Sequence, residues 1–151
     1  MAVTRTAAEI VAALRMEPIP EEGAWLVQGP RVPGLSTIRA LIADSPDGFS
    51  AMHRLAIDEG WQWLDGSPLT MLLMHPDGTA ESTVLDEEHP QVVVPRGAWQ
   101  GARSLGPWTL VACWCAPAFE DGHFALGDRA ALTAAYPDSA DEIATLTREE
   151  A

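Results

Sequence analysis

Short extended runs separated by turn residues are the feature that most constrains the fold of this chain. From residue 24 to residue 116, apolar and β-branched runs recur at intervals of roughly 8 to 12 residues. The turn sequences SPDG, DGSP and HPDG separate several of them. The runs that we expect to be strands are 24–29, 35–43, 49–57, 59–66, 69–75, 80–86, 90–97, 99–105 and 108–116. So many short strands predict an all-β sandwich or barrel, and a closed barrel or a jelly roll would leave few strand edges exposed.

Helical patterns are confined to the two ends of the chain. We expect helices over 6–16, 127–137 and 139–146. Thr6 followed by Glu9 has the sequence of a capping box, and Ser139 followed by Glu142 repeats it. Asp128 is placed to cap the helix that follows it.

The charge balance limits the kinds of partner. The 151 residues carry a net charge of −13, and all nine basic residues are arginines. A surface this acidic repels phosphate backbones and anionic lipids, so we expect no nucleic-acid partner and no membrane partner. The absence of lysine also excludes a Schiff-base mechanism. A chain of this length is most simply one domain that buries a core of its own.

The N-terminus and the cysteines favour a cytoplasmic protein. No apolar run approaches the roughly 20 residues that span a bilayer, and the N-terminus lacks the pattern of a secretion signal. Cys113 and Cys115 are separated by a single residue, which is too close for a disulfide that would staple the fold. We expect both to be buried thiols in a reducing compartment.

Two spaced patterns carry the functional signal. The first reads His-x-Leu-x3-Glu-x6-Gly from His53 to Gly66 and contains Glu59, and the second reads Pro-x-Gly-x2-Gln from Pro95 to Gln100. They resemble the two halves of the cupin motif, His-x-His-x3-Glu-x6-Gly and Pro-x-Gly-x2-His. In cupins the two motif strands lie side by side, and three histidines and the glutamate bind one metal ion inside the barrel.

The resemblance is closest to a small single-domain cupin family, the cupin-five group. The segments that carry it are EEGAW, FSAMHRLAIDEGWQW, DGSPLTMLLMHPDG, PQVVVPRGAWQGAR, WTLVACWCAPAF and LTAAYP, in the order of the family. The resemblance implies a double-stranded β-helix, which is a jelly-roll barrel, with short N- and C-terminal helices. We therefore expect one cupin domain over 1–151, with its N-terminal helix at 6–16, its barrel at about 20–126 and its C-terminal helices within 128–146.

The ligand positions of the motif argue against a metal. Leu55 stands at the second histidine position, and Gln100 stands at the third. Leucine has no lone pair, and a neutral amide oxygen is a poor ligand for metals that prefer imidazole. His53 and Glu59 alone are too few protein ligands for a stable zinc, iron or manganese site. We predict no metal and no cofactor.

What remains is a polar group inside an apolar barrel. Strand alternation places His53 and Leu55 on one face, and it places Glu59, Trp61 and Trp63 together on a face that the cupin pattern turns inward. A glutamate among tryptophans is desolvated, which raises its pKa and suits it to proton transfer with a neighbouring histidine. We therefore predict His53 and Glu59 as the catalytic pair. The predicted ligand-binding residues are Arg39, Leu55, Trp61, Trp63, Trp99, Gln100 and Ser104.

These residues also allow structural interpretations. His53, Glu59 and Gln100 could simply hydrogen-bond to one another, because buried polar groups are nearly always paired. Arg39, within an apolar strand, either recognises an anionic ligand or pairs with one of the 22 acidic residues. The residues expected to support the motif are Glu22, Trp25 and Arg103.

Three functions follow from these alternatives. The first is a metal-independent isomerase, epimerase, cyclase or lyase that acts on a small organic molecule, including anionic ones, with His53 and Glu59 as acid and base. The second is a non-catalytic module that binds or senses a small ligand in the same barrel. The third is a metal-dependent oxygenase. A homodimer is expected in each case, because cupins of this size commonly pair through their sheet edges.

Overall fold

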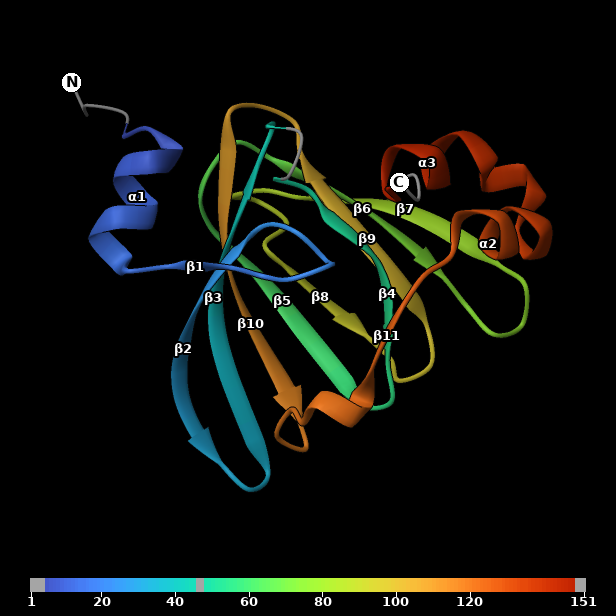
Figure 1. Ribbon diagram of the computed structural model, residues 1–151, viewed down its shortest axis with the longest axis horizontal. Helices are drawn as coiled ribbons and strands as arrows, with labels where there is room; N and C mark the ends of the chain where they lie inside the picture. Colours follow the sequence, from blue (N-terminus) through green and yellow to red (C-terminus); the bar gives the residue numbers. More distant parts are fainter. Residues whose placement is uncertain (1–4, 46–47, 149–151) are drawn as a thin grey trace.

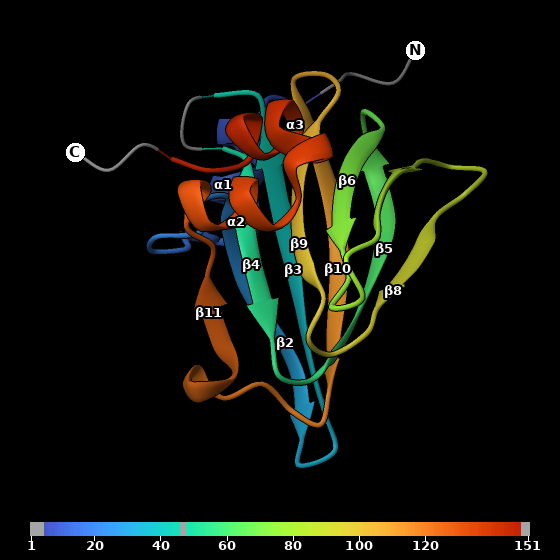
Figure 2. The ribbon, with the colours of Figure 1, turned by 90° about the vertical axis from the view of Figure 1, so that its right-hand side faces the viewer.

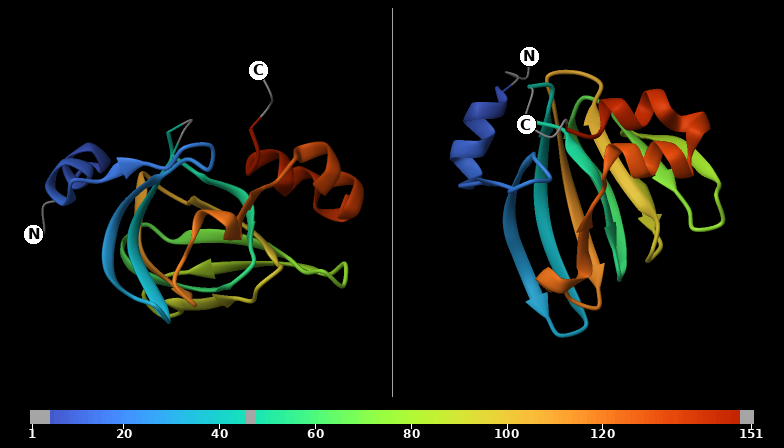
Figure 3. Two further views of the ribbon diagram at one scale, coloured as in Figure 1. Left: turned by 60° about the horizontal axis from the view of Figure 1, so that its bottom comes forward. Right: turned by 45° about the vertical axis from the view of Figure 1, so that its right-hand side comes forward.

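Two antiparallel sheets face each other and form a barrel (Figures 1 and 3). The computed structural model describes residues 5–45 and 48–148. One sheet has the strand order β1-β2-β3-β10-β5-β8, and the other has the order β11-β4-β9-β6-β7. The strands are β1 (Glu17–Pro18), β2 (Trp25–Val32), β3 (Leu35–Ala43), β4 (Ser50–Leu55), β5 (Asp58–Gly66), β6 (Leu69–Met74), β7 (Ala80–Leu85), β8 (Gln91–Val94), β9 (Trp99–Ser104), β10 (Trp108–Ala116) and β11 (Phe124–Leu126). The predicted all-β jelly-roll fold is confirmed.

Each of the nine predicted runs contains a strand, and two further strands were not predicted. β1 has two residues and pairs with β2, while β11 has three residues and pairs with β4. Segments this short carry no alternation of their own, so their extended form depends on the partner strand.

Short helices lie on two flanks of the barrel, with α1 on one side and α2 and α3 on the other (Figure 1). In Figure 2 the view is from the side of α2 and α3, and α1 lies behind them. They are α1 (Ala7–Leu14), α2 (Arg129–Ala135) and α3 (Ala140–Thr145), with 3-10 turns at Asp121–His123 and Pro137–Ser139. The Thr6 hydroxyl accepts from the Glu9 N–H at 3.2 Å, and the Asp128 carboxylate accepts from the Ala131 N–H at 2.8 Å. The Asp128 cap is confirmed, and of the Thr6–Glu9 capping box the bond to the Thr6 hydroxyl is confirmed. None of the helices in the described ranges is long and apolar enough to cross a membrane.

The second predicted capping box is wrong. Ser139 precedes α3 but makes no side-chain cap hydrogen bond. The Glu142 carboxylate instead accepts from the hydroxyl of Ser82 on β7. A tertiary contact across 60 residues has therefore replaced the local bond that the sequence pattern indicates.

The inner and outer faces of the sheets are buried by different partners. Inside the barrel, Leu73 and Val111 belong to one apolar cluster shared by both sheets. On the outside, Ile10 of α1 packs with Leu41 of β3, while Ile143 of α3 belongs to a cluster that covers the other sheet. The helices thus cover outer faces, and the interior of the barrel is left to side chains from the strands.

Candidate functional site

A cavity of about 420 Å³ lies inside the barrel. Its walls come from β2, β3, β4, β5 and β10, and from the segments around residues 19–24 and 119–124. The apolar side chains include Ile38, Leu55, Trp61, Phe119 and Phe124. Its volume falls within the range of about 300–1,000 Å³ that is usual for small-molecule pockets.

His53 presents one ring nitrogen to this cavity. Its side chain lies on β4, opposite Gln100 of β9, so the two halves of the sequence motif are neighbours. Nδ1 lies 2.7 Å from the carbonyl oxygen of Ala51, which can only accept a hydrogen bond, so Nδ1 carries the proton. Nε2 of the neutral ring then has a lone pair, and it has no hydrogen-bond partner among the described residues. The ring stacks on Phe124 with 5.4 Å between centroids.

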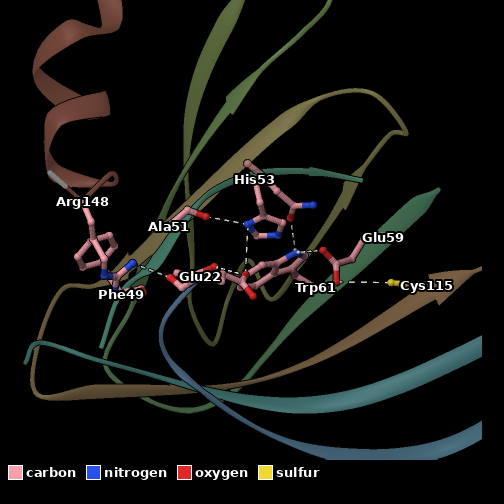
Figure 4. A network of polar contacts seen from close by, with 10 residues as sticks. Glu22, Phe49, Ala51, His53, Glu59, Trp61, Cys115 and Arg148 are labelled. Atoms are coloured by element: carbon pink, nitrogen blue, oxygen red, sulfur yellow. Dashed lines mark hydrogen bonds and ion pairs between the residues drawn. The ribbon is translucent and has the colours of Figure 1, made fainter. Parts of the chain in front are cut away.

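Glu22 contacts the same nitrogen of the His53 ring as the Ala51 carbonyl oxygen does (Figure 4). Its Oε1 lies 3.2 Å from Nδ1 of His53 and accepts a hydrogen bond from the hydroxyl of Ser50 at 2.7 Å. The Glu22 side chain is 13% exposed and lines the cavity. Histidine orientation and tautomer are therefore fixed by a carbonyl and a carboxylate together.

The turn that carries Glu22 has an unusual backbone. Glu21 and Ala24 have φ values of 65°, and Gly23 has a φ of 90°. Residues other than glycine rarely adopt positive φ values, so surrounding contacts must hold the backbone of this turn in place. Arg148 supplies one of them, because its Nη1 donates to the Glu22 carbonyl oxygen at 2.7 Å and its guanidinium lies 3.9 Å from the ring centroid of Phe49.

Glu59 is buried beside His53. One carboxylate oxygen accepts a hydrogen bond from Nε1 of Trp61 at 3.2 Å, and the other accepts one from the Cys115 thiol, whose Sγ lies 3.6 Å away. Burial raises the pKa of Glu59, and the charge on Glu22 adds to this rise. Positive charge on His53 acts in the opposite direction on the same pKa. The site therefore favours a protonated Glu59 near a histidine.

Gln100 lies behind Trp61. Its Oε1 accepts from Nε1 of Trp61 at 2.8 Å, while its buried Nε2 makes no hydrogen bond to any of the described residues. The amide still lies near enough to Glu59 to lower the pKa of that carboxyl slightly against the effect of burial. Trp61 thus links Glu59 to the position where a metal-binding cupin has its third histidine.

Comparison with known proteins identifies the family. Residues 8–127 match the Cupin_5 family, described as cupin superfamily (DUF985). This chain belongs to that cupin family. The comparison with curated proteins gives no match.

Solved structures agree with this assignment. A protein from Shewanella oneidensis is 27% identical with a TM-score of 0.88, covering 97% of this chain and 100% of its own. A hypothetical protein from Leishmania major is 23% identical with a TM-score of 0.86, covering 96% of this chain and 100% of its own. Oxalate decarboxylase from Bacillus subtilis is 11% identical with a TM-score of 0.61, covering 89% of this chain and 38% of its own.

The cupin metal position does not fit a metal in this chain. Within residues 5–45 and 48–148, no group of three His, Cys, Asp or Glu side chains is arranged to hold a metal ion. Leu55 offers no donor atom, and the Gln100 oxygen already accepts from Trp61. Glu59 accepts hydrogen bonds on both oxygens. We therefore derive no step that uses a metal.

Several predicted contacts lie elsewhere. Leu55 and Trp61 line the cavity as expected, whereas Trp63 and Trp99 do not. Trp63 turns its Nε1 to the Ser67 carbonyl oxygen at 3.0 Å. Trp99 lies on the outer face of β9, where the Arg54 guanidinium sits 4.6 Å from its ring centroid. Neither residue belongs to the cavity wall, for two different reasons. Trp99 alternates with the inward Gln100 and so faces outward, whereas Trp63 packs against the inner apolar cluster at another height of the barrel, which alternation does not predict.

Arg39, Gln100 and Ser104 are also absent from the cavity wall. Arg39 is exposed on the outer face of β3, because its neighbours Ile38 and Ala40 point inward. Ser104 is buried but pairs with Thr109, with 2.8 Å between the two hydroxyl oxygens.

The predicted support residues fall into two groups. Glu22 contacts His53 directly. Trp25 packs against the cluster beneath α1, and Arg103 is exposed on β9, beside a shallow depression lined by Asp141 and Glu142. Neither of these two residues is part of the cavity wall.

Sequence reasoning missed other parts of the site. Ser50, Cys113 and Cys115 all line the cavity. The two thiols are buried, as expected, and burial raises the pKa of both above the ordinary value. Alternation on β10 could have placed them on the cavity face, but the pairing of Cys115 with Glu59 on β5 could not be read from the sequence.

Proposed function

We propose that this cupin is a metal-independent enzyme that moves protons within a small organic molecule, as an isomerase, epimerase, cyclase or lyase. The observation that carries the proposal is the pairing of two groups at one cavity. His53 offers an unpartnered Nε2, and Glu59 is a carboxyl whose pKa is raised by burial. A base and an acid of this kind are what proton transfer at neutral pH requires.

The chemistry balances without a redox partner. Nε2 of His53 takes a proton from a C–H bond of the bound molecule, and the electron pair of that bond stays in the molecule as a new π bond. Glu59 delivers its proton to another atom of the same molecule. The substrate therefore loses one proton and gains one, and it is isomerised. Exchange with solvent then removes the proton from Nε2 of His53 and reprotonates Glu59.

The remaining residues act on the two reacting groups. Glu22 and the Ala51 carbonyl oxygen keep the His53 proton on Nδ1, so that Nε2 stays available as a base. Trp61 holds Glu59, and the apolar wall formed by Leu55 and Phe124 excludes water. Exclusion of water strengthens the electrostatic interactions within the site.

A binding module is the second candidate. It is favoured by the largely apolar wall and by the Trp61 indole, which already pairs with both Glu59 and Gln100. A binder needs only shape and hydrogen bonds, whereas the enzyme needs His53 and Glu59 to exchange protons with the ligand. The likeness to oxalate decarboxylase is a likeness of fold at 11% identity and carries no activity to this chain.

Deuterium incorporation tests the proposal. The purified protein is first analysed for its elemental content and, by native mass spectrometry, for a retained molecule. That molecule and a panel of small carbon acids are then incubated with the protein in D2O. We expect no stoichiometric transition metal, and we expect deuterium incorporation that His53→Ala and Glu59→Gln each reduce by at least about 100-fold, the scale of general acid–base catalysis.

The control variant is Arg39→Ala, which changes an exposed residue outside the cavity and should retain incorporation. Stoichiometric iron, manganese, nickel or zinc would contradict the metal-independent mechanism. Incorporation that survives both cavity variants would contradict the assigned roles, and a retained molecule that never exchanges would favour the binding module.

A further inference from the structure

Two polar groups at the cavity have unpaired hydrogen-bond acceptors. Nε2 of the neutral His53 ring has a lone pair and no partner among the described residues, although the residue is only 3% exposed. Glu22 uses Oε1 for Ser50 and His53, and its other oxygen has no donor among the described residues. A buried acceptor without a donor is costly unless a ligand or water supplies one.

Most donors of the same wall are already committed. The hydroxyl of Ser50 donates to Glu22, the hydroxyl of Thr37 donates to the Pro30 carbonyl oxygen, and the indole N–H of Trp61 is shared by Glu59 and Gln100. Two buried O–H donors remain, the hydroxyl of Ser36, whose oxygen accepts from the Phe119 N–H, and the O–H of protonated Glu59. Neither of them lies on the Glu22 carboxylate, so a ligand that binds there must bring its own N–H or O–H group.

The charges of the wall point in the same direction. The charged and titratable groups that line the cavity, thiols aside, are Glu21, Glu22, Arg31, His53, Glu59 and Asp121. Among the described residues of the wall there is one guanidinium, that of Arg31, and it already donates to the Phe119 carbonyl oxygen at 2.7 Å and to Glu120 at 2.8 Å. An anionic ligand would therefore meet several carboxylates and a single cation that is already paired with Glu120, which disfavours binding.

We infer that the cavity binds a small organic cation, an apolar body carrying a protonated amine whose N–H groups donate to Glu22, so that Nε2 of His53, held beside Glu22, stays free to act as the base. This inference deepens the proposed function, since it names the class of molecule for the same cavity. It replaces the anionic ligand that Arg39 suggested, because Arg39 lies outside the cavity. Ile38, Leu55, Phe119 and Phe124 would contact the apolar body.

Three probes of nearly equal shape test the charge preference. Benzylamine, benzyl alcohol and benzoate share one ring and carry a positive, a neutral and a negative group at pH 7. Binding is measured by 1H–15N NMR on the intact protein, with the indole N–H of Trp61 as the reporter because that residue lines the cavity. We expect benzylammonium to bind at least about tenfold more tightly than either other probe, the scale of one charge-assisted hydrogen bond.

Two matched variants locate the recognition. Glu22→Gln keeps the shape of the side chain and should weaken benzylammonium on the order of tenfold while changing benzyl alcohol less than about twofold. Glu88→Gln removes the same charge from an exposed position outside the cavity and should change neither. Three results would overturn the inference. The first is a Trp61 signal that does not change when benzylammonium is added. The others are benzyl alcohol or benzoate binding as tightly as benzylammonium, and equal weakening of benzylammonium binding by both variants.

The outcome is separable from the proposed enzyme. Saturable ammonium binding without deuterium exchange in any retained molecule or small amine would keep the ligand class and remove the acid–base function. Exchange into an uncharged or anionic molecule, with no ammonium binding, would keep the acid–base function and remove the ligand class.

Discussion

Two buried polar clusters stand at opposite ends of β10 and show what distinguishes a site from a structural contact. The closed cluster is Ser67, Ser104 and Thr109. The Thr109 hydroxyl donates to the Ser67 carbonyl oxygen at 2.8 Å, and it pairs with the Ser104 hydroxyl at 2.8 Å. The two buried hydroxyls, those of Ser104 and Thr109, therefore both have partners inside the protein and do not require a ligand.

The open cluster is Glu22, His53 and Glu59. It is nearly as buried as the closed one, but Nε2 of His53 lacks a partner among the described residues and faces a cavity. Burial and polarity are common to both clusters, so neither marks the site. The difference lies in unpaired acceptors next to space that a small molecule can fill.

The largest expected effect is on the free energy of unfolding, at Trp61, which connects the open cluster to the core. Trp61→Phe removes the indole N–H that serves both Glu59 and Gln100, and it leaves the buried Gln100 oxygen without a donor. We expect the free energy of unfolding, measured in urea, to fall by about 2–4 kcal/mol. Trp63→Phe is the control, since that half-buried indole bonds only the Ser67 carbonyl oxygen; its loss should be about 1 kcal/mol. Equal losses would contradict the bridging role of Trp61.

The next effect breaks the closed cluster. Thr109→Val keeps the shape of a side chain that is 0% exposed, but it removes one of the two donors to the Ser67 carbonyl oxygen and leaves the buried Ser104 hydroxyl without its Thr109 partner. The free energy of unfolding should fall by about 1–3 kcal/mol, and benzylammonium affinity should stay unchanged. A loss of affinity comparable to that of Glu22→Gln would show that the two clusters are not independent.

A smaller effect tests the turn that holds Glu22. Arg148→Met removes the hydrogen bond to the Glu22 carbonyl oxygen and should lower the free energy of unfolding by about 1–2 kcal/mol. It should also weaken benzylammonium binding, because Glu22 loses its fixed position. Arg103→Met, at an exposed position away from the turn, is the control. If both variants bind the amine as the parent does, Arg148 has no positioning role.

The smallest effect is a difference in pH dependence between adjacent residues. Burial raises the pKa of Glu59 above 4.5, so the stability associated with its protonated form is lost as the pH rises from 4.5 through the folded-state pKa. Hydrogen bonds from Arg96 lower the pKa of Asp58 below 3.8, so the stability from its charged form is lost as the pH falls through that lower pKa.

Thermal melts from pH 3 to pH 9 separate the two signs. Relative to the parent chain, Glu59→Gln should gain stability as the pH rises above 4.5, whereas Asp58→Asn should be less stable near neutral pH and match the parent at the acid end. Parallel curves for Glu59→Gln and the parent would mean that the Glu59 carboxyl titrates as it does in the unfolded chain.

The fold could be predicted because its signals are local. Apolar runs and turn residues define strands without knowledge of their partners, and the spacing from His53 to Gly66 and from Pro95 to Gln100 identifies the two strands that meet. The helix caps at Thr6 and Asp128 depend on residues three positions away and were correct. Ser139 was not, because Glu142 bonds a distant strand.

The site could be predicted only in part because its decisive contacts are distant in sequence. Alternation shows that Ser104 and Cys115 both point inward, but it does not give their height in the barrel, and only Cys115 reaches the cavity. Glu22 meets Ser50 across 28 residues, through a turn that strand patterns do not describe. Which acceptors remain unpaired depends on all of these contacts together.

The site depends most on Nε2 of His53 being an unprotonated acceptor that faces the cavity. Long-range 1H–15N NMR of the imidazole rings measures this directly, with His53→Asn to assign the signal among the four histidines. At a pH where the ring is neutral, we expect a proton on Nδ1, bonded to the Ala51 carbonyl oxygen, and an Nε2 without a proton whose chemical shift changes when benzylammonium is added. A neutral ring with its proton on Nε2, or a bare Nε2 that no probe moves, would contradict this expectation.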